Sequence, residues 1–280
     1  MSLSVNTVIN QADELLRLPD SALRVFELTQ AEDTQLETLV EAIQIDPTLV
    51  AKLLRLANSP LFSRGTDITA LDRAVAILGY QEIGQIAVVM AAAKEFDKIE
   101  TELLQASSFW SHSLTTAVLA RRMASQCGMR GDGVFVAALL HDLGLPVQFA
   151  LCGNEMTAAL DLSIVEDDIS LITAENHILG FDHTCVGALL CQQWRLPDVI
   201  IETARHHHQP SKATSHQETV AIVAWANIVE TLGTNPDPES VEVYLPVVAQ
   251  AASIVPLEMP KNDELLSAAQ QEATEMLSLF

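Results

Sequence analysis

The chain has 280 residues, enough for one large domain or two modest ones, and 49% of them are hydrophobic, which is ample material for a core. Its formal net charge at pH 7 is −22. An acidic surface repels phosphate backbones and anionic lipid headgroups, so we expect neither nucleic acid nor a membrane among its partners.

The composition predicts an all-α protein of the cytoplasm. Alanine and leucine dominate, and the apolar–polar alternation typical of strands is sparse. The N-terminus lacks a basic-then-apolar targeting pattern, and the longest uninterrupted apolar run, residues 86–93, is far shorter than a membrane span. The four cysteines show no C-x-x-C spacing, and a chain with a large core needs no disulfide, so we expect reduced thiols.

The first helices are predicted from apolar spacing and capping residues. Residues 3–17 carry apolar side chains at helical spacing, and a second helix is predicted to begin near Ser21. Thr34 is followed three residues later by Glu37, which is the spacing of a capping box and predicts the start of a third helix.

Two further start signals follow. Asp46 before Pro47 predicts the start of a helix that ends at Asn58. The Asp46 carboxylate can cap the first turn, and proline suits the first helical position because the N–H that it lacks would have no partner there. Thr69 predicts the start of a helix that Gly79 ends. The next helix, predicted at residues 81–93, is nearly all apolar, so it must lie inside the molecule or between two halves of it.

The polar stretch 94–101 is the best candidate for a boundary within the chain. It separates an N-terminal helical subdomain, residues 1–98, from a second helical subdomain with the C-terminal helices, residues 99–280. In the second part, helices are predicted at residues 109–127, 134–142, 152–162, 170–179, 185–194, 197–208, 217–232, 238–254 and 261–280.

An apolar helix, residues 134–142, ends on two adjacent polar side chains, His141 and Asp142, before Gly144 and Pro146, which we take to end the helix. Burying these two groups unpaired costs about 1–3 kcal/mol each. One explanation is a metal ion, which imidazole and carboxylate both suit. The other is a hydrogen-bonded His–Asp pair that fixes the helix end.

The remaining histidines decide between these explanations. His112 lies in an apolar helix, His183 precedes one, and residues 206–208 form a histidine triplet in the last turn of another. The triplet also suits the negative end of its helix, so a purely structural role is open. His177 and His216 are expected at the surface. Gathered around one cavity, the other histidines and the doublet would form a site of five or six ligands for iron, zinc or manganese.

Several segments together resemble the HDOD family, which is related to the HD-domain phosphohydrolases. The resemblance covers roughly residues 15–230. The segments that carry it are IDPTLVAKLLRLANSP (45–60), ITALDRAVAILG (68–79), WSHS (110–113), ALLHDLG (138–144), GFDHTCVGALL (180–190), WRLP (194–197) and HHQP (207–210). The resemblance implies an N-terminal helical subdomain packed on an HD-domain-like helical core, and a role as a signalling output or regulatory module.

The resemblance also implies a set of metal ligands. His112, His141 and Asp142 match the first histidine and the doublet of the HD motif, whereas the position of its distant aspartate is Asn227 here. In the related HD-GYP phosphodiesterases, which hold two metals, the second set of histidines is matched by His183, His207 and His208. The implied ligands are therefore His112, His141, Asp142, His183, His207, His208 and Asn227, with iron, manganese or zinc as the cofactor, or no metal at all.

The chain departs from the enzymes of that superfamily at several positions. Ser108 stands where HD-GYP enzymes have a glutamate, Leu145 and Pro146 follow the doublet's glycine where those enzymes have a lysine, and residues 211–213 replace the Gly-Tyr-Pro signature. An amide at Asn227 supplies no charge, so metal affinity and water activation should both fall. The sequence thus favours a site that has lost its hydrolytic chemistry.

Three functions follow as hypotheses. The first is a non-enzymatic signal-transduction module with a degenerate metal site, which binds signalling proteins. The second is a metal-dependent phosphohydrolase that acts on a nucleotide or a cyclic dinucleotide. The third is a binding module that retains a metal or uses the emptied cavity to sense a nucleotide. Turnover that depends on His141 and Asp142 would favour the second.

Overall fold

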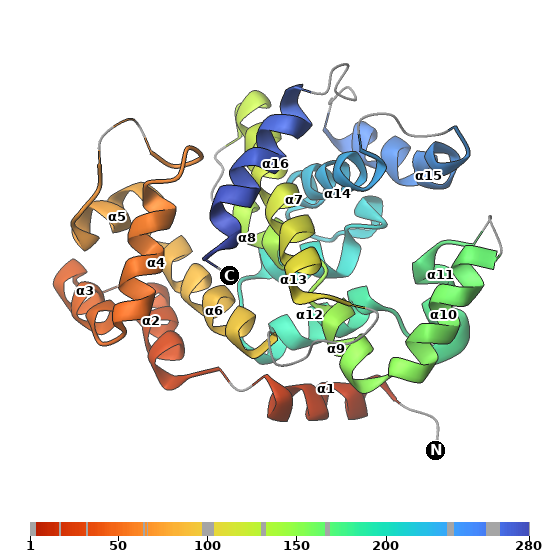
Figure 1. Cartoon of the computed structure of the whole chain (residues 1–280), viewed down its shortest axis with the longest axis horizontal. Coiled ribbons are helices and arrows are strands. Elements are labelled where there is room, and N and C mark those ends of the chain that lie inside the picture. The colour runs from red at the N-terminus through yellow and green to blue at the C-terminus, as the bar shows by residue number, and fades with distance from the viewer. Residues whose placement is uncertain are drawn as a thin grey trace.

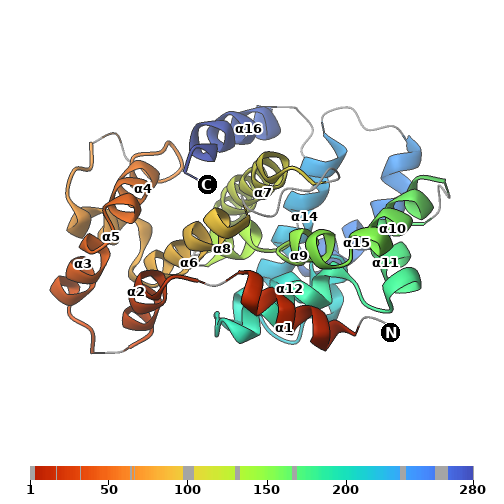
Figure 2. The ribbon, with the colours of Figure 1, turned by 60° about the horizontal axis from the view of Figure 1, so that its bottom comes forward.

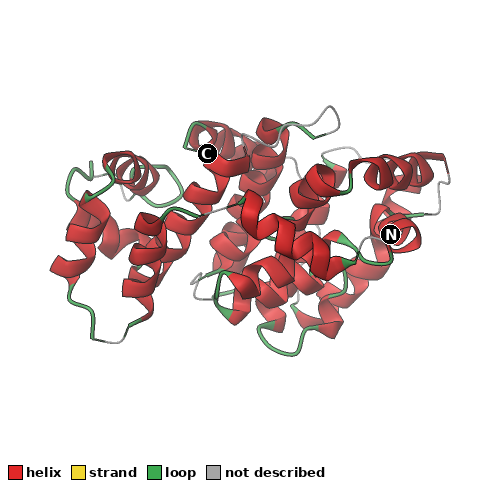
Figure 3. Cartoon of the chain, turned by 90° about the horizontal axis from the view of Figure 1, so that it is seen from below, coloured by secondary structure: helices red, strands yellow, loops and turns green. Residues whose placement is uncertain are grey.

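The computed structural model describes residues 4–16, 18–31, 33–63, 65, 67–96, 104–129, 133–165, 169–233, 238–255 and 264–279. These residues form sixteen α-helices and one short 3-10 helix, and none of them lies in a strand (Figure 3). The all-α prediction is confirmed.

Six helices precede the predicted boundary. They are α1 (Val5–Leu15), α2 (Asp20–Gln30), α3 (Leu36–Gln44), α4 (Pro47–Ala57), α5 (Leu71–Leu78) and α6 (Tyr80–Phe96). Helices α2 to α5 lie together at one end of the molecule, and α6 leads from them to its centre (Figure 1).

The other helices build the remainder of the molecule. They are α7 (Ala106–Gln126), α8 (Val134–Leu139), α9 (Gly144–Leu151), α10 (Gly153–Val165), α11 (Leu171–Leu179), α12 (His183–Gln193), α13 (Asp198–His206), the 3-10 helix η1 (Pro210–Lys212), α14 (Gln217–Leu232), α15 (Pro238–Ile254) and α16 (Glu264–Leu277). Helix α7 is central, since it packs against α8, α14 and α16. Helices α10, α11 and α15 lie at the end away from α2 to α5 (Figure 1).

The apolar helix α6 lies between two groups of helices, as its composition predicts. It packs against α2, α4 and α5 on one side and against α8 on the other. Most of its residues are buried, among them Ile83, Ile86 and Val89. A helix with so little polar surface can be accommodated only where neighbours cover it on all sides.

Helix α1 packs mainly outside the N-terminal group of helices. It lies along α9 and α12, at the underside of the second group (Figure 2). The division at residues 98 and 99 stays a prediction, because residues 97–103 lie outside the part of the chain that the structure describes.

The predicted helix starts differ in outcome. Asp46 caps α4 as expected, with its Oδ1 accepting from the amides of Thr48 at 2.9 Å and Leu49 at 3.2 Å. The capping roles of Thr34 and Thr69 are wrong, because α3 begins at Leu36 and α5 at Leu71, and neither helix has a side-chain cap.

The helix predicted at residues 134–142 ends earlier. Helix α8 ends at Leu139, the doublet lies in the turn that follows, and Gly144 and Pro146 belong to the first turn of α9. Proline is tolerated there because the first amides of a helix need no partner within it. The doublet is thereby held in a turn between two buried helices.

In the part of the chain that the structure describes, two apolar segments are long enough to be compared with membrane spans. Residues 134–151 are long and apolar enough to cross a membrane, but 83% of them are buried inside the fold. Helices α5 and α6 reach the length and hydropathy of a membrane span only when they are taken together, and the chain bends by 100° between them. Both segments are built into the helical packing.

Candidate metal centre

Five histidines and one aspartate from distant parts of the chain meet at one point. The Oδ2 atom of Asp142 lies 3.2 Å from Nε2 of His141 and 3.5 Å from Nε2 of His112. Its Oδ1 atom lies 3.1 Å from Nε2 of His207 and 3.5 Å from Nε2 of His183. The two oxygens of one carboxylate therefore face two separate groups of imidazoles.

The two groups have the dimensions of metal sites. One consists of His112, His141 and Asp142, and the other of Asp142, His183, His207 and His208, with all ligand atoms of a group within 4.8 Å of one another. The Nε2 atoms of His112 and His141 are 3.4 Å apart, and those of His183 and His208 are 3.2 Å apart. Nitrogens bound tetrahedrally at zinc–nitrogen distances of about 2.0–2.1 Å lie roughly 3.3 Å from each other.

Backbone carbonyls fix two of the rings. Nδ1 of His141 lies 2.6 Å from the Ala138 carbonyl oxygen, and Nδ1 of His207 lies 3.1 Å from those of Thr203 and Ala204. An Nδ1–H that donates to a carbonyl leaves the lone pair on Nε2, which is the nitrogen that faces Asp142. Both rings are thus oriented as ligands.

Carboxylates fix two more rings. Nδ1 of His183 donates to Oε2 of the fully buried Glu175 at 2.8 Å, and the same oxygen accepts from the His183 amide at 2.8 Å. Nδ1 of His112 pairs with Oε2 of Glu230. A carboxylate behind a ligating imidazole is the usual outer shell of a metal site, and it raises the basicity of the ring.

Sequence reasoning missed Glu175 and Glu230. Glu230 follows Asn227 by three residues on α14, so helical spacing alone places both on one face. Glu175 lies eight residues before His183 on a different helix, and nothing local pairs them. Only the packing of α11 on the start of α12 reveals its role.

Asn227 lies beside this cluster, on the wall of the cavity next to it, and is 7% exposed. Its Oδ1 accepts from the Thr231 hydroxyl at 3.4 Å. The exposed histidines His177 and His216 lie outside the cluster, as predicted.

The pKa is raised in two histidines of the cluster and lowered in two others. Burial lowers the pKa of His112, but hydrogen bonds and charges of Asp142 and Glu230 outweigh it and raise the pKa to about 10. Burial also lowers the pKa of His183, and the Glu175 and Asp142 charges raise it to about 9. Near neutral pH these two rings hold protons where a cation would otherwise supply the positive charge.

For His207 and His208, the effect of burial on the pKa outweighs the attraction to the Asp142 carboxylate. It lowers the pKa of His207 to about 4 and, together with the neighbouring histidines, holds that of His208 well below its usual value. Burial raises the pKa of Asp142, but its hydrogen bonds and attraction to the surrounding imidazoles outweigh this and hold it well below the usual range. An ionised aspartate beside neutral imidazoles is the protonation state that a metal ion requires.

Two buried atoms at the centre have no hydrogen-bond partner. They are Oδ1 of Asp142 and Nε2 of His207, which are close to each other but not in hydrogen-bond geometry. Buried polar atoms of this kind are rare and need a partner. A divalent cation between them fits, and a donor set of imidazoles with one carboxylate suits iron, zinc or manganese.

Tight packing of two helices brings the doublet next to His183. A Cβ atom on Gly144 would overlap the carbonyl oxygen of His183 and lie 2.7 Å from the Gly187 nitrogen. Only glycine therefore allows α9 to approach α12 this closely. The approach sets the distance between Asp142, two residues before Gly144, and the first turn of α12.

A cavity of about 340 Å³ adjoins the cluster, reaching His112, Asp142, His183 and His208. Its other lining residues are uncharged: Leu145, Ser170, Leu171, Ile172, Thr173, Gln209, Asn227, Thr231, Val243, Tyr244 and Val247. Burial and the Asp142 charge raise the pKa of the Tyr244 phenol. Among the described residues that line this cavity there is no lysine or arginine.

The fold and the histidine–aspartate cluster define an HD-domain-like helical protein. Residues 15–210 match the HDOD domain, which is most of the chain, and the protein belongs to the HDOD family. The family predicted from the sequence segments is confirmed.

Solved structures share this fold. A crystal structure named "Putative phosphohydrolase" from Shewanella amazonensis SB2B is 23% identical, with a TM-score of 0.73 and 97% of each chain covered. One named "Putative signal transduction protein" from Marinobacter aquaeolei VT8 is 18% identical, with a TM-score of 0.70, covering 96% of this chain and 61% of that one.

Among curated proteins, an uncharacterized protein of Treponema pallidum (strain Nichols) is 26% identical over 225 residues. The match covers 79% of this chain and 43% of that protein, so the chain spans less than half the length of this relative.

Proposed function

We propose that this HDOD protein is a regulatory module of a signalling system, whose histidine-rich centre holds divalent metal in its two ligand groups and which acts by binding a small ligand or a partner protein without hydrolysing phosphate esters. The observation that carries the proposal is the convergence of five imidazoles on a single carboxylate, Asp142. The imidazoles provide metal affinity, whereas hydrolysis needs more negative charge and a means of binding phosphate.

The carboxylates near the centre support binding rather than hydrolysis. Glu230 and Glu175 are both engaged with the Nδ1 atoms of histidines, which leaves Asp142 as the carboxylate that faces the ligand nitrogens in the described part of the chain. The position of the distant aspartate of the HD motif is Asn227. A bound metal supplies Lewis-acid chemistry, and its power to activate water depends on this ligand sphere.

The cavity beside the centre lacks the basic side chains that bind phosphate. Phosphoryl-transfer sites stabilise charge with arginine, lysine and helix N-termini in addition to metal ions, and of these three the described lining offers helix N-termini alone, such as the first turn of α11, at residues 170–173. The lining residues of this cavity that the structure describes include no basic side chain. A phosphodiester held there would have no lysine or arginine side chain of the described lining to neutralise it.

A metal-dependent phosphohydrolase remains the second candidate. It is favoured by the two oxygens of Asp142, which face one group of imidazoles each, because two-metal hydrolases bridge their ions with a shared ligand. The two candidates differ in turnover, which can be measured directly.

The test combines metal analysis with a phosphodiesterase and nucleotidase screen. Protein purified without chelator is analysed for iron, manganese and zinc, alongside His112→Ala, His141→Ala and the control His216→Ala, whose histidine is exposed and outside the cluster. We expect bound metal in the wild type and the control and its loss in the other two. Turnover of bis(p-nitrophenyl) phosphate, nucleotides and cyclic dinucleotides should be the same in wild type and His141→Ala.

A further variant tests the role of the missing carboxylate. Asn227→Asp should tighten metal binding by about tenfold, which is the scale of effects in metal outer shells. Metal-dependent turnover in the wild type that is absent from His141→Ala would contradict the proposal and establish the phosphohydrolase.

A further inference from the structure

The cavity beside the metal cluster has two chemically different sides. The histidines and Asp142 come from α7, from the turn after α8, and from the first turn of α12 and the residues after α13. The apolar side chains Leu171, Ile172, Val243 and Val247 come from α11 and α15, which contribute no ligand. A molecule in this cavity therefore meets the metal site on one side and a hydrocarbon wall on the other.

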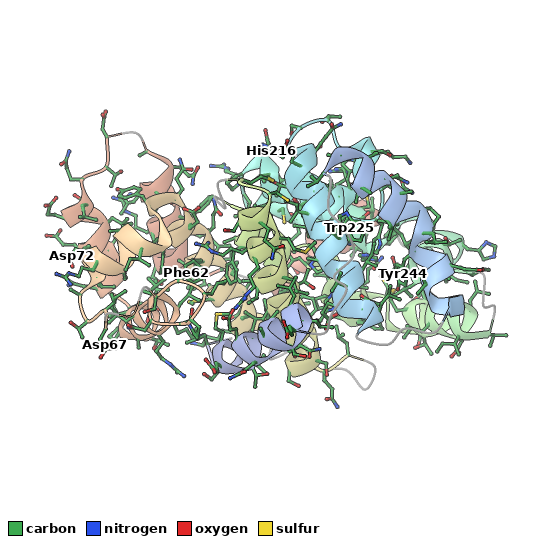
Figure 4. The ribbon with its side chains drawn as sticks, turned by 90° about the horizontal axis from the view of Figure 1, so that it is seen from above. Phe62, Asp67, Asp72, His216, Trp225 and Tyr244 are labelled. Carbon is green, nitrogen blue, oxygen red and sulfur yellow. The ribbon has the colours of Figure 1, made fainter. Side chains whose placement is uncertain are left out.

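Uncharged hydrogen-bonding groups lie between these two sides. Thr173, Thr231 and Tyr244 provide hydroxyls, and Gln209 and Asn227 provide amides. Tyr244 lies on α15, the helix that packs along α14 (Figure 4). Small-molecule sites typically combine such an apolar lining with a few polar groups that orient the ligand.

The size of the cavity limits the ligand. Its volume of about 340 Å³ is at the lower end of the range for ligand pockets. At the ~30 Å³ that a water molecule occupies in the liquid, it accommodates about eleven non-hydrogen atoms. A cyclic dinucleotide is far larger than this.

The charge of the centre favours an anion with one charge. With a divalent cation in each of the two ligand groups, opposed by the carboxylates of Asp142, Glu175 and Glu230, the centre keeps one positive charge when the imidazoles are neutral. One carboxylate neutralises that charge, whereas a phosphate dianion exceeds it, and the described lining has no basic side chain to compensate.

We propose that this cavity binds a short-chain aliphatic monocarboxylic acid, with its carboxylate at the metal cluster, the Tyr244 hydroxyl donating to it, and its chain against Leu171, Ile172, Val243 and Val247. The proposal rests on the metal centre of the proposed function and names its ligand class. The apolar wall formed by Val243 and Val247 lies beyond residues 15–210, which match the HDOD domain. Ligand choice is therefore a property of this chain's C-terminal helices.

The test measures binding of acetate, butyrate and hexanoate to the metal-loaded full chain by isothermal titration calorimetry. Burial of a methylene contributes about 0.8 kcal/mol, so affinity should rise about fourfold for each methylene until the cavity is full. Inorganic phosphate and a cyclic dinucleotide, titrated in the same way, should bind more weakly than hexanoate.

Three single substitutions in α15 separate the contributions of the apolar wall and of the Tyr244 hydroxyl to acid binding. Val247→Phe fills the apolar side and should weaken hexanoate binding by at least tenfold with little effect on acetate. Tyr244→Phe should weaken all three acids by roughly fivefold, the loss of one hydrogen bond. Leu245→Phe is the matched control, because Leu245 is on the same helix but 50% exposed and outside the cavity lining, and it should bind like the wild type. Metal content should be the same in all three.

The outcomes distinguish a failure of the ligand proposal from a failure of the proposed metal centre. Stoichiometric metal without acid binding, or acid binding that does not depend on chain length, overturns the ligand proposal and leaves the metal-binding module intact. Tighter binding of phosphate or the cyclic dinucleotide also overturns it. Absence of metal overturns both proposals.

Discussion

At the scale of single residues, four of the five histidines in the cluster use their two nitrogens differently. In His112, His141, His183 and His207, Nε2 faces Asp142 and Nδ1 is held from behind by a carbonyl or a carboxylate. For His112, His183 and His207 the partner behind the ring goes with the direction in which the pKa of the ring is shifted. His207, held by carbonyls, has its pKa lowered to about 4 by burial, whereas His112 and His183, held by Glu230 and Glu175, have values of about 10 and about 9 despite burial.

This difference predicts proton release when metal binds. His112 and His183 are protonated at pH 7, and a ligating nitrogen must give up its proton, so each should release one. Because protons compete with the metal, apparent metal affinity should rise as pH increases from 7 towards 9 and 10, where these two groups lose their protons without metal. Calorimetric titrations with Zn²⁺ in two buffers of different ionisation enthalpy measure the released protons. A binding enthalpy independent of the buffer would contradict this assignment.

At the scale of secondary-structure elements, helix ends carry most of the candidate metal ligands. The doublet lies in the turn after α8, His183 is the first residue of α12, and His207 and His208 follow the end of α13. The last carbonyls of a helix have no partner within it. The carbonyls of Ala138, Thr203 and Ala204 accept from the Nδ1 atoms of His141 and His207, and those of Ala138 and Thr203 also accept from the backbone amides of the same two histidines. The same helix ends thus position the rings and satisfy their own backbone.

Helix capping at α12 should therefore affect metal binding. Asp182 caps this helix, accepting from the Cys185 amide at 3.0 Å and from the Thr184 hydroxyl at 2.6 Å, and it immediately precedes His183. Asp182→Ala should lower the free energy of unfolding by about 1 kcal/mol and weaken metal binding, because the first turn that carries His183 loses its anchor.

The matched control is Asp46→Ala, which removes the equivalent cap from α4, a helix that carries no ligand. It should lower the free energy of unfolding by a similar amount and leave metal affinity unchanged. Urea denaturation and zinc titration measure the two effects. Equal losses of metal affinity in both variants would mean that general stability, and not the position of His183, controls the site.

At the scale of the whole molecule, long-range helix packing creates the centre. Its candidate ligands span residues 112 to 208, and Gly144 and Gly187 allow α9 and α12 to cross closely enough to bring them together. Helix α1 packs against these two helices from below (Figure 2). The N-terminal helix thus supports the crossing from outside.

Gly144→Ala should disrupt both fold and centre. The added Cβ overlaps the His183 backbone, and backbone cannot move aside as a flexible side chain can, so we expect a loss of about 3 kcal/mol, the upper part of the range for overpacked cores, together with loss of metal. Gly153→Ala is the control, since nothing lies within 4 Å of its added Cβ. Thermal denaturation and metal content measure the outcome. A Gly144→Ala protein with wild-type melting temperature and metal would show that the close crossing is dispensable.

Much of the fold is predictable from the chain itself. Apolar spacing identifies the helices, and Asp46 before Pro47 marks the start of α4. Thr34 fails as a cap because its amide bonds to the Ala31 carbonyl and its own carbonyl accepts from the Tyr80 hydroxyl at 3.0 Å, which makes it part of the turn before α3. A contact with a residue 46 positions away overrides the local pattern.

The start of α5 shows the same effect. The Asn58 side chain bonds to both the amide and the carbonyl of Ile68, each at 2.8 Å, and so holds the chain before this helix. The helix begins at Leu71, two residues after the predicted cap Thr69. Local capping patterns identify that a helix exists more reliably than where it begins, because tertiary contacts compete at its ends.

The sequence by itself determined the helical class, the HDOD family and the identity of the imidazole and aspartate side chains, because apolar period and residue type are local properties. Tertiary structure alone decided that His112, the doublet, His183 and the residues after α13 share one point. It also decided that Glu175 and Glu230 stand behind two of the rings, and that α15 lines the adjoining cavity. The distance between residues far apart in the chain depends on how helices pack, and no local pattern encodes it.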